Sequence, residues 1–294
     1  MLIHAPAKLN LCLYLGGRRK DGLHELLSLF EPLALADPIR VSEARASAVR
    51  DEVHCEGVEG DPADNLGARA LAALRAQGWA APPLRVEIEK RIPIAAGLGG
   101  GSADAAALLR LAREPLGRSG WMQVGWTPDL VAIAAELGAD VPSQLVPALS
   151  LVRGAGERVV RLPDPEPHAV VLLPDGGGLS TAAVFAEADR LGLGRSAEEI
   201  DELAKRLHKA AGAGASPLDY PELLVNDLEP AARSLRPEIG AALDELRSAG
   251  APLALLTGSG PTAFGLFGDL AAAEEAAGRL DRDDAIVCEA GRAR

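Results

Sequence analysis

The sequence has few aromatic residues and few cysteines. Phe, Trp and Tyr make up 3% of the 294 residues, so we expect the hydrophobic core to consist mainly of Leu, Val, Ile and Ala. The three cysteines, Cys12, Cys55 and Cys288, lie far apart and show no Cys-x-x-Cys spacing. Neither a disulfide framework nor a zinc site is predicted, and this cysteine usage is typical of a reducing cytoplasm.

Long apolar runs and an excess of positive charge are also missing. No run of apolar residues reaches the roughly 18 residues of a membrane-spanning helix, and the N-terminal residues do not have the pattern of a signal peptide. The formal net charge of −12 argues against nucleic acid or an anionic membrane as a partner. We therefore expect a cytoplasmic protein without nucleic acid or membrane partners.

The most informative stretch is residues 93–106, where four glycines separate a predicted strand from a predicted helix. Residues 84–90 alternate apolar and polar, which indicates a strand, and residues 102–113 are rich in Ala and Leu, which predicts a helix. Glycine lets a ligand approach the backbone closely. The free amides of a first helical turn favour an anion such as phosphate. The glycines are Gly97, Gly99, Gly100 and Gly101.

Two well-known phosphate loops do not match this stretch. A Walker A loop needs a Lys before its Ser or Thr, and Ser102 follows Gly101 directly. A dinucleotide fingerprint counted from Gly97 and Gly99 needs a third glycine at position 102. From the loop alone, phosphate binding and a tight turn into a buried helix both remain open.

Lys8 and Asn10 project from the same face of a strand predicted over residues 3–15. The opposite face is apolar, which leaves two interpretations of the polar pair. In the first interpretation Lys8 and Asn10 belong to an ordinary solvated face, although Cys12 and Tyr14 make this face less polar than a face exposed to water. In the second they are a functional pair.

Asp140 and His24 each have a structural and a functional interpretation. Asp140 follows a helix predicted to begin with Thr127 as its cap and to end at Gly138, and its carboxylate can form an Asx turn there. His24 lies beside a charged turn, where a histidine is more often structural. A catalytic carboxylate and a ligand-binding histidine are the alternatives. A second glycine turn spans residues 257–262.

These parts match the needs of phosphoryl transfer. Backbone amides hold nucleotide phosphates, a metal and a cation offset charge, and a carboxylate receives the proton of the attacking hydroxyl. An ammonium group beside that carboxylate favours its ionised form and can help to position the hydroxyl oxygen.

Strands and helices are mixed without strict alternation, which predicts an α+β fold in two parts. Residues 33–59 suggest short strands with loops, and 169–173 a buried strand. Helices are predicted over 66–77, 182–191, 197–211, 237–248 and 270–280, and strands over 252–256, 263–267 and 285–289. Pro and acidic residues gather at 162–168, so we place a domain boundary there, between residues 1–162 and 163–294.

Five motifs together resemble one superfamily. Ala5-Pro-Ala-Lys-Leu-Asn10, the 93–104 loop and Leu256-Thr-Gly-Ser-Gly-Pro-Thr262 are similar to the three motifs of the galactokinase, homoserine kinase, mevalonate kinase and phosphomevalonate kinase (GHMP) superfamily. Asp21-Gly-Leu-His24 and Gly138-Ala-Asp-Val-Pro142 narrow the resemblance to its kinases of a cytidine-diphospho sugar alcohol, 4-diphosphocytidyl-2-C-methyl-erythritol, in the non-mevalonate isoprenoid route.

The resemblance implies an ATP- and Mg²⁺-dependent kinase that phosphorylates the 2-hydroxyl of the methylerythritol unit. It implies a ribosomal-protein-S5-like N-terminal domain and a ferredoxin-like C-terminal domain, in a monomer or weak homodimer. Asp140 matches the catalytic base and Lys8 its partner. The implied ATP contacts are Asn65, Leu66, Lys90, Pro93, Ile94, Ala95, Ala96, Gly97, Leu98, Gly99, Gly100, Gly101, Ser102 and Ala103. The implied substrate contacts are Asn10, Leu23, His24, Thr181, Phe185, Gly258 and Ser259, with His24 at the cytosine.

The chain departs from the family pattern near the substrate. Leu23 stands where the family usually has an aromatic that stacks on the cytosine, and Ser143-Gln144 and residues 146–148 also differ. Two alternatives therefore stay open: another kinase of the superfamily, of homoserine or mevalonate type, and a non-catalytic ligand-binding relative. No metal ligand is assigned from the sequence.

Overall fold

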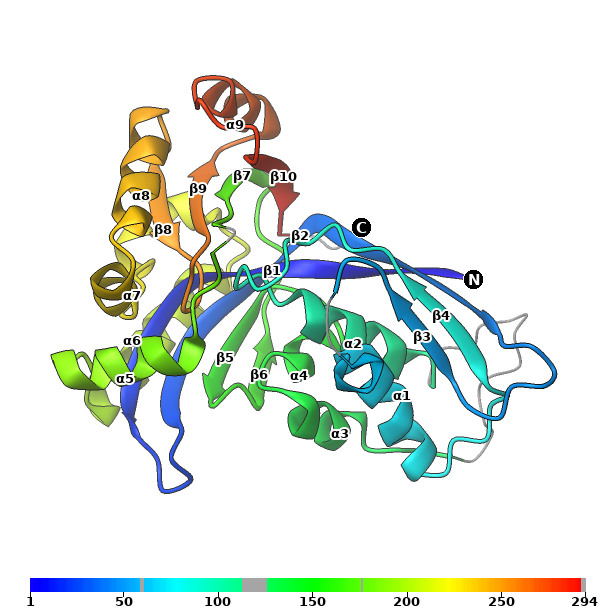
Figure 1. Ribbon diagram of the computed structural model, residues 1–294. Coiled ribbons are helices and arrows are strands. Elements are labelled where there is room, and N and C mark those ends of the chain that lie inside the picture. The colour runs from blue at the N-terminus through cyan, green and yellow to red at the C-terminus, as the bar shows by residue number, and fades with distance from the viewer. Residues whose placement is uncertain (59–60, 113–125, 176, 292–294) are drawn as a thin grey trace.

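The computed structural model describes residues 1–58, 61–112, 126–175 and 177–291. Two long antiparallel strands, β1 (Leu2–Arg18) and β2 (His24–Glu43), run through the middle of the molecule (Figure 1). In Figure 1 the first helices lie together below these strands, and the elements that follow β7 lie to the left and above. β1 and β2 therefore contribute to both parts of the fold.

The N-terminal part packs helices against one sheet. β2 pairs antiparallel with β4 (Leu84–Ile88) and β5 (Ser150–Gly154), while β3 (Glu52–Cys55) pairs parallel with β4 and β6 (Arg158–Arg161) pairs with β5. The helices are α1 (Leu66–Ala76), α2 (Gly100–Arg110), α3 (Leu130–Leu137) and α4 (Val141–Gln144), preceded by the 3₁₀ turn η1 (Pro62–Asp64). The apolar residues of α1 and α2 are buried against β2 and β4 in one core.

The C-terminal part has an antiparallel sheet in the order β10 (Ile286–Ala290), β7 (His168–Leu173), β9 (Ala263–Phe267), β8 (Leu253–Leu256). Its helices are α5 (Thr181–Leu191), α6 (Ala197–Ala211), α7 (Glu229–Leu235), α8 (Glu238–Ser248) and α9 (Leu270–Ala277), with the 3₁₀ turns η2 (Pro217–Asp219) and η3 (Pro221–Leu223). β10 joins the first part through Ala290, which pairs with Leu33 of β2.

β1 also bonds directly to the C-terminal part. The Leu13 amide donates to the Val225 carbonyl at 2.8 Å, and the Asp227 amide donates to the Leu13 carbonyl at 2.8 Å. One core cluster accordingly combines β1 and β2 residues with residues of β7, β9 and α6. Leu, Val, Ile and Ala dominate the buried residues, as expected, and Tyr14 and Phe264 are the largest fully buried side chains.

The α+β prediction and most predicted elements are confirmed, with three corrections. β2 is one strand through Glu43, not a set of short strands with loops, because β1 on one side and β4 and β5 on the other hold it extended. α2 begins at Gly100, two residues before the prediction. α3 begins after Asp129, whose carboxylate accepts the amides of Val131 and Ala132, so the predicted cap Thr127 is wrong.

The structure leaves two sequence predictions untested. The domain boundary between residues 162 and 163 stays a prediction. Residue 113, the predicted end of the second helix, lies outside the described residues. Among the helices that the structure does describe, none is both long enough and apolar enough to cross a membrane.

Candidate active site

Lys8 and Asn10 are buried at the junction of the two parts, with exposures of 5% and 3%. The Lys8 ammonium donates to Asn10 Oδ1 at 2.6 Å, and the Lys8 amide donates to the Leu98 carbonyl at 3.0 Å. The glycine loop therefore covers this part of β1. The interpretation of the pair as part of a solvated face is wrong.

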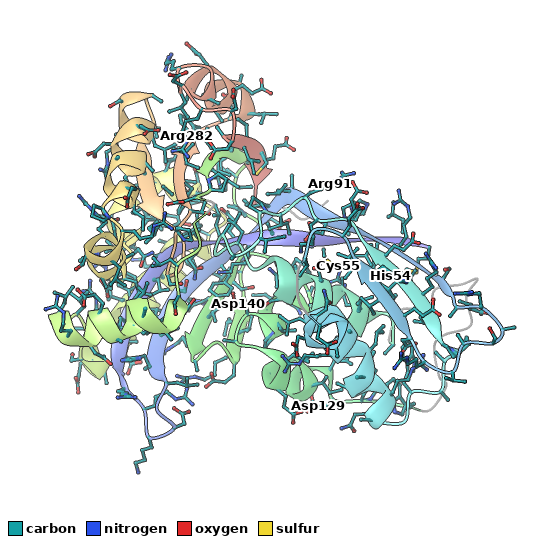
Figure 2. The ribbon with its side chains drawn as sticks, in the orientation of Figure 1. His54, Cys55, Arg91, Asp129, Asp140 and Arg282 are labelled. Carbon is teal, nitrogen blue, oxygen red and sulfur yellow. The ribbon has the colours of Figure 1, made fainter. Side chains whose placement is uncertain are left out.

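Asp140 lies against Lys8. Its Oδ2 is 3.3 Å from Lys8 Nζ, and the Asp140 side chain keeps 32% of its exposure. Asp140 stands at the cap position of α4, yet its side chain makes no capping bond to the described amides of that helix. The Asx-turn alternative is therefore wrong. Figure 2 shows Asp140 near the centre of the molecule, where the two parts meet.

Neighbouring groups fix the Asn10 side chain and the Lys8 ammonium. Asn10 donates from its backbone amide to Thr257 Oγ1 and from Nδ2 to Ser28 Oγ, each at 2.9 Å. The Lys8 ammonium lies 4.8 Å from the centre of the Phe30 ring, a cation–π contact. Because Asn10 is held from both strands and from the second glycine turn, its Oδ1 offers Lys8 a fixed acceptor.

The two glycine turns pack against each other. Thr262 Oγ1 donates to the Ala96 carbonyl at 2.7 Å, and a Cβ on Gly97 would lie 2.8 Å from the Gly260 carbonyl oxygen. Gly97 has a φ of 78° and Gly99, which caps α2, a φ of 70°. A side chain at either position would be strained; one on Gly97 would also separate the turns, and one on Gly99 would press on Lys8, so the sequence needs glycine here.

Two adjoining cavities contain almost all the predicted site residues. The central cavity, of about 790 Å³, is lined by the predicted catalytic and substrate residues Lys8, Asn10, Leu23, His24, Asp140, Thr181, Phe185, Gly258 and Ser259. The loop cavity, of about 360 Å³, is lined by the predicted ATP contacts Asn65, Leu66 and Lys90 and the loop residues from Pro93 to Ser102. Gly97 and Gly99 line both. Ala103 is the exception, because its side chain is buried in the core below the loop cavity.

Comparison with known proteins assigns this arrangement to a family. The model for the GHMP kinases N terminal domain matches residues 65–147, and that for GHMP kinases C terminal matches residues 219–285. The chain is 37% identical to a 4-diphosphocytidyl-2-C-methyl-D-erythritol kinase of Pelotomaculum thermopropionicum, covering 95% of this chain and 93% of that one. The chain belongs to this kinase family.

Further members of the family agree. The kinase of the same name from Streptomyces avermitilis is 40% identical, with 95% of this chain and 91% of that one covered. A crystal structure of a 4-(cytidine 5'-diphospho)-2C-methyl-D-erythritol kinase superposes with a TM-score of 0.77 at 33% identity, over 99% of this chain and 100% of the other. The predicted GHMP fold and the prediction of an ATP-dependent small-molecule kinase are confirmed, and the homoserine-type, mevalonate-type and non-catalytic alternatives are not favoured.

His24 is held by a partner that sequence reasoning missed. Its Nε2 lies 2.7 Å from Asp189 Oδ1, and its ring centre lies 5.3 Å from that of Phe185 at an interplanar angle of 36°. Both partners come from α5, which begins at the Ser180 cap. Phe185 was predicted from the family pattern, whereas Asp189 follows it by one helical turn, a spacing that could have indicated it.

Lys90, a predicted ATP contact, pairs with two buried carboxylates that the sequence analysis did not assign to the site. Lys90 donates to Asp37, and its Nζ lies 2.8 Å from Asp104 Oδ2. Asp104 belongs to the motif quoted above, but its role could not be inferred from its place in α2. Asp37, 53 residues before Lys90, gave no local signal.

The residues present are compatible with Mg²⁺ bound through a nucleotide. In the described residues 1–58, 61–112, 126–175 and 177–291, no group of three or more His, Cys, Asp or Glu side chains could hold a metal. Mg²⁺ usually keeps several waters and takes one or two carboxylates plus substrate phosphates. Asp104 is already engaged by Lys90, which leaves Asp64 and the Ser102 hydroxyl in the loop cavity and the partly exposed Asp140 in the central cavity.

Proposed function

We propose that this protein transfers the γ-phosphoryl group of ATP to the 2-hydroxyl of 4-diphosphocytidyl-2-C-methyl-D-erythritol, in the non-mevalonate route to isoprenoid precursors. The observation that carries this proposal is the shared wall of the two cavities. Gly97 and Gly99 line both the loop cavity and the central cavity, and Lys8 lies against Gly99. A phosphoryl group at this wall faces Lys8 and Asp140.

In this mechanism Asp140 accepts the proton of the attacking hydroxyl. The adjacent Lys8 ammonium stabilises the negative charge on the carboxylate and on the developing alkoxide. Asn10 holds the ammonium in place through its Oδ1. The carboxylate is partly exposed to the cavity, as a base that receives a substrate proton has to be.

The loop cavity would hold ATP. The first-turn amides of α2 and the helix dipole favour the triphosphate, and Asn65, Leu66 and Lys90 line the same cavity. Mg²⁺ would be held mainly by phosphate oxygens, and the side chains available to it are Asp64 and Ser102 in the loop cavity and Asp140 in the central cavity; when bound it offsets the phosphate charge. The chain itself supplies no cation within the loop.

The cytidine end would lie between His24 and Phe185. Both side chains line the central cavity together with Leu23, Thr181 and Ser259, and Thr181 Oγ1 and Ser259 Oγ are 2.9 Å apart. Phe185 is the ring available for stacking on a base. Leu23, 55% exposed, offers an aliphatic surface in place of the usual aromatic.

A coupled ADP-release assay tests the proposal. With ATP and Mg²⁺, turnover is expected with the cytidine-diphospho substrate and not with homoserine or mevalonate. Asp140→Asn and Lys8→Met should each lower kcat by about 10²- to 10⁴-fold in protein that remains folded. Asp129→Asn is the control, because Asp129 lies at the outer end of α3, away from Asp140 (Figure 2), and asparagine also caps helices.

Two outcomes count against the proposal. Full activity of Asp140→Asn would remove Asp140 as the base. Turnover of homoserine or mevalonate alone would support phosphoryl transfer and argue against the cytidine pocket.

We further propose that the enzyme acts in the cytoplasm as a monomer or weak homodimer, without nucleic acid or membrane partners. Sedimentation of the purified protein tests the oligomeric state, and sedimentation of cell fractions tests the location and these partners.

A further inference from the structure

Three charged side chains connect the two ends of the glycine loop. Lys90 directly follows β4 and precedes the loop, while Asp104 lies in α2, after the loop. The Lys90 ammonium is 2.8 Å from Asp104 Oδ2 and also donates to Asp37 Oδ2 on β2. We call Asp37, Lys90 and Asp104 the loop bridge.

Asp37 also holds the backbone where the loop begins. Its Oδ1 accepts the amide of Arg91 at 2.6 Å and that of Ile92 at 2.8 Å. One carboxylate thus fixes two consecutive amides and an ammonium. The next residue, Pro93, is the first of the loop residues that line the loop cavity.

The loop bridge is almost completely removed from solvent. The side chains of Asp37, Asp104 and Lys90 are exposed by 0%, 3% and 11%. Burial raises the pKa of Asp104 to about 6 against the opposing effect of the Lys90 charge. Burial would lower the pKa of Lys90, but its two carboxylate partners outweigh that effect and raise it. Loss of one partner would leave a buried charge uncompensated, which is costly.

The loop itself has little else to fix its shape. Residues 92–103 contain no charged side chain and four glycines, and glycine adopts many backbone conformations at little cost. Contacts with the second glycine turn hold its middle, through Thr262 and the Ala96 carbonyl. The loop bridge holds its two ends.

We propose that Asp37 and Asp104 are positioning residues for ATP, which act through Lys90 to hold the ends of the glycine loop where its amides face the phosphates. This inference rests on the proposed function of the loop. Neither carboxylate needs to touch the nucleotide. Asp104 lines the loop cavity, but its Oδ1 is buried out of contact with solvent among the described residues and its Oδ2 is held by Lys90.

Asp37→Asn and Asp104→Asn test this proposal, with Asp51→Asn as a matched control. Asp51 also forms an ion pair and accepts a backbone amide: its carboxylate lies 2.7 Å from Arg75 Nη2 and accepts the Leu84 amide at 2.8 Å. Through Leu84 it contacts the first residue of β4, at the opposite end of that strand from the loop. Asn in each case keeps the size of the side chain and removes its charge.

The kinetic readout separates positioning from general stability. We expect Asp37→Asn and Asp104→Asn to raise the KM for ATP about tenfold, which is about 1.4 kcal/mol, with the KM for the cytidine substrate changed less than about twofold. The double variant should cost less than both single changes together, since both act through Lys90. Asp51→Asn should lower the melting temperature without changing either KM.

Calorimetric titration with ADP and Mg²⁺ gives a readout that does not depend on turnover. ADP should bind about tenfold more weakly to both loop-bridge variants and normally to Asp51→Asn. Normal ADP binding by folded Asp104→Asn would overturn the proposal, as would equal losses in all three variants. If Asp37→Asn does not fold, Asp104→Asn decides, because it leaves the amide contacts of Asp37 intact. Absence of turnover in the wild type would refute the proposed function and leave this titration valid.

Discussion

Gly99 lies against Lys8, one of the two proposed catalytic residues, and leaves no room for a side chain of its own. A Cβ built on it lies 3.0 Å from both Cγ and Cε of Lys8, and its φ of 70° is unfavourable for other residues. Lys8 can move only away from the loop, and any such movement changes its distance to Asp140. At the scale of single residues, the absence of a side chain is therefore as important as the charges.

We expect Gly99→Ala to lower kcat at least about tenfold, because it displaces Lys8 and strains the backbone by about 1–2 kcal/mol. Gly78→Ala is the control. Gly78 also has a positive φ, of 87°, but no described atom lies within 4 Å of its Cβ position. Both variants should lose similar free energy of unfolding in urea, and only Gly99→Ala should lose activity. Equal activities would show that Lys8 does not depend on Gly99.

At position 23, a single side chain is expected to change the affinity for the cytidine substrate. Base–aromatic stacking is worth about 1–3 kcal/mol, so Leu23→Tyr should lower the KM for the cytidine substrate by about fivefold or more and leave the KM for ATP unchanged. Val160→Tyr, at a similarly exposed residue of β6, controls for a new surface aromatic. A KM unchanged by Leu23→Tyr would mean that position 23 does not contact the base.

Among the elements, α1 and α3 begin in the same way but differ in their surroundings. Asn65 accepts the amides of Gly67 and Ala68 at 2.8 and 3.3 Å, and Asp129 accepts two amides of α3 at 3.1 and 3.0 Å. Only Asn65 also lines the loop cavity. The start of α1 is thus both a helix cap and a part of the wall of a cavity.

Asn65→Ala and Asp129→Ala should each lower the free energy of unfolding by about 1 kcal/mol. Only Asn65→Ala should also raise the KM for ATP, because it loosens the first turn of α1 beside the nucleotide. Chemical denaturation and steady-state kinetics on the two variants measure both effects. A raised KM in Asp129→Ala as well would point to a general loss of stability.

Local signals were enough to predict helices but not the length of β2. The start and stop signals of α6 and α8 lie in the sequence next to the helices; α6 has the predicted bounds, and α8 begins one residue after the prediction. β2 is extended over 20 residues because strands distant in the chain pair with it, which no local pattern shows. The start of α3 was misplaced because Thr127 and Asp129 are both good caps.

The same division applies to the site. Lys8, Asp140 and the glycine loop could be found because each has its own motif. Asp37 has no such signal, since its partner Lys90 lies 53 residues away. Asp189 has only its helical spacing to Phe185, and its contact with His24 joins residues 165 positions apart. Such contacts follow from the tertiary fold alone.

At the scale of the whole molecule, a buried ion pair joins the two parts. His168 of β7 lies with Nε2 3.0 Å from Glu31 Oε2 of β2, and both side chains are fully buried. Burial alone would lower the pKa of His168, but the charge of Glu31 and the hydrogen bond to it outweigh burial and raise it above the ordinary 6.5. The pair therefore favours folding while the histidine is protonated.

The sign of the pH dependence follows from that raised pKa. The contribution of His168 is complete below pH 6.5, the ordinary pKa of an unfolded histidine, and is lost as the pH rises through the higher folded-state pKa. The free energy of unfolding should fall over this range by no more than about 1.4 kcal/mol per pH unit. His168→Gln should remove this part of the slope in urea titrations, and an unchanged slope would contradict the assignment.

The pairing of β1 with the C-terminal part also has a consequence for synthesis on the ribosome. Leu15 bonds to Asp227, 212 residues later. At roughly 5–20 residues per second, about 10 to 40 seconds pass between the synthesis of Leu15 and that of Asp227. During that time one edge of the apolar strand that carries Lys8 is without its final neighbours. The nascent chain is most vulnerable to misassociation in this interval, and slower translation would lengthen it.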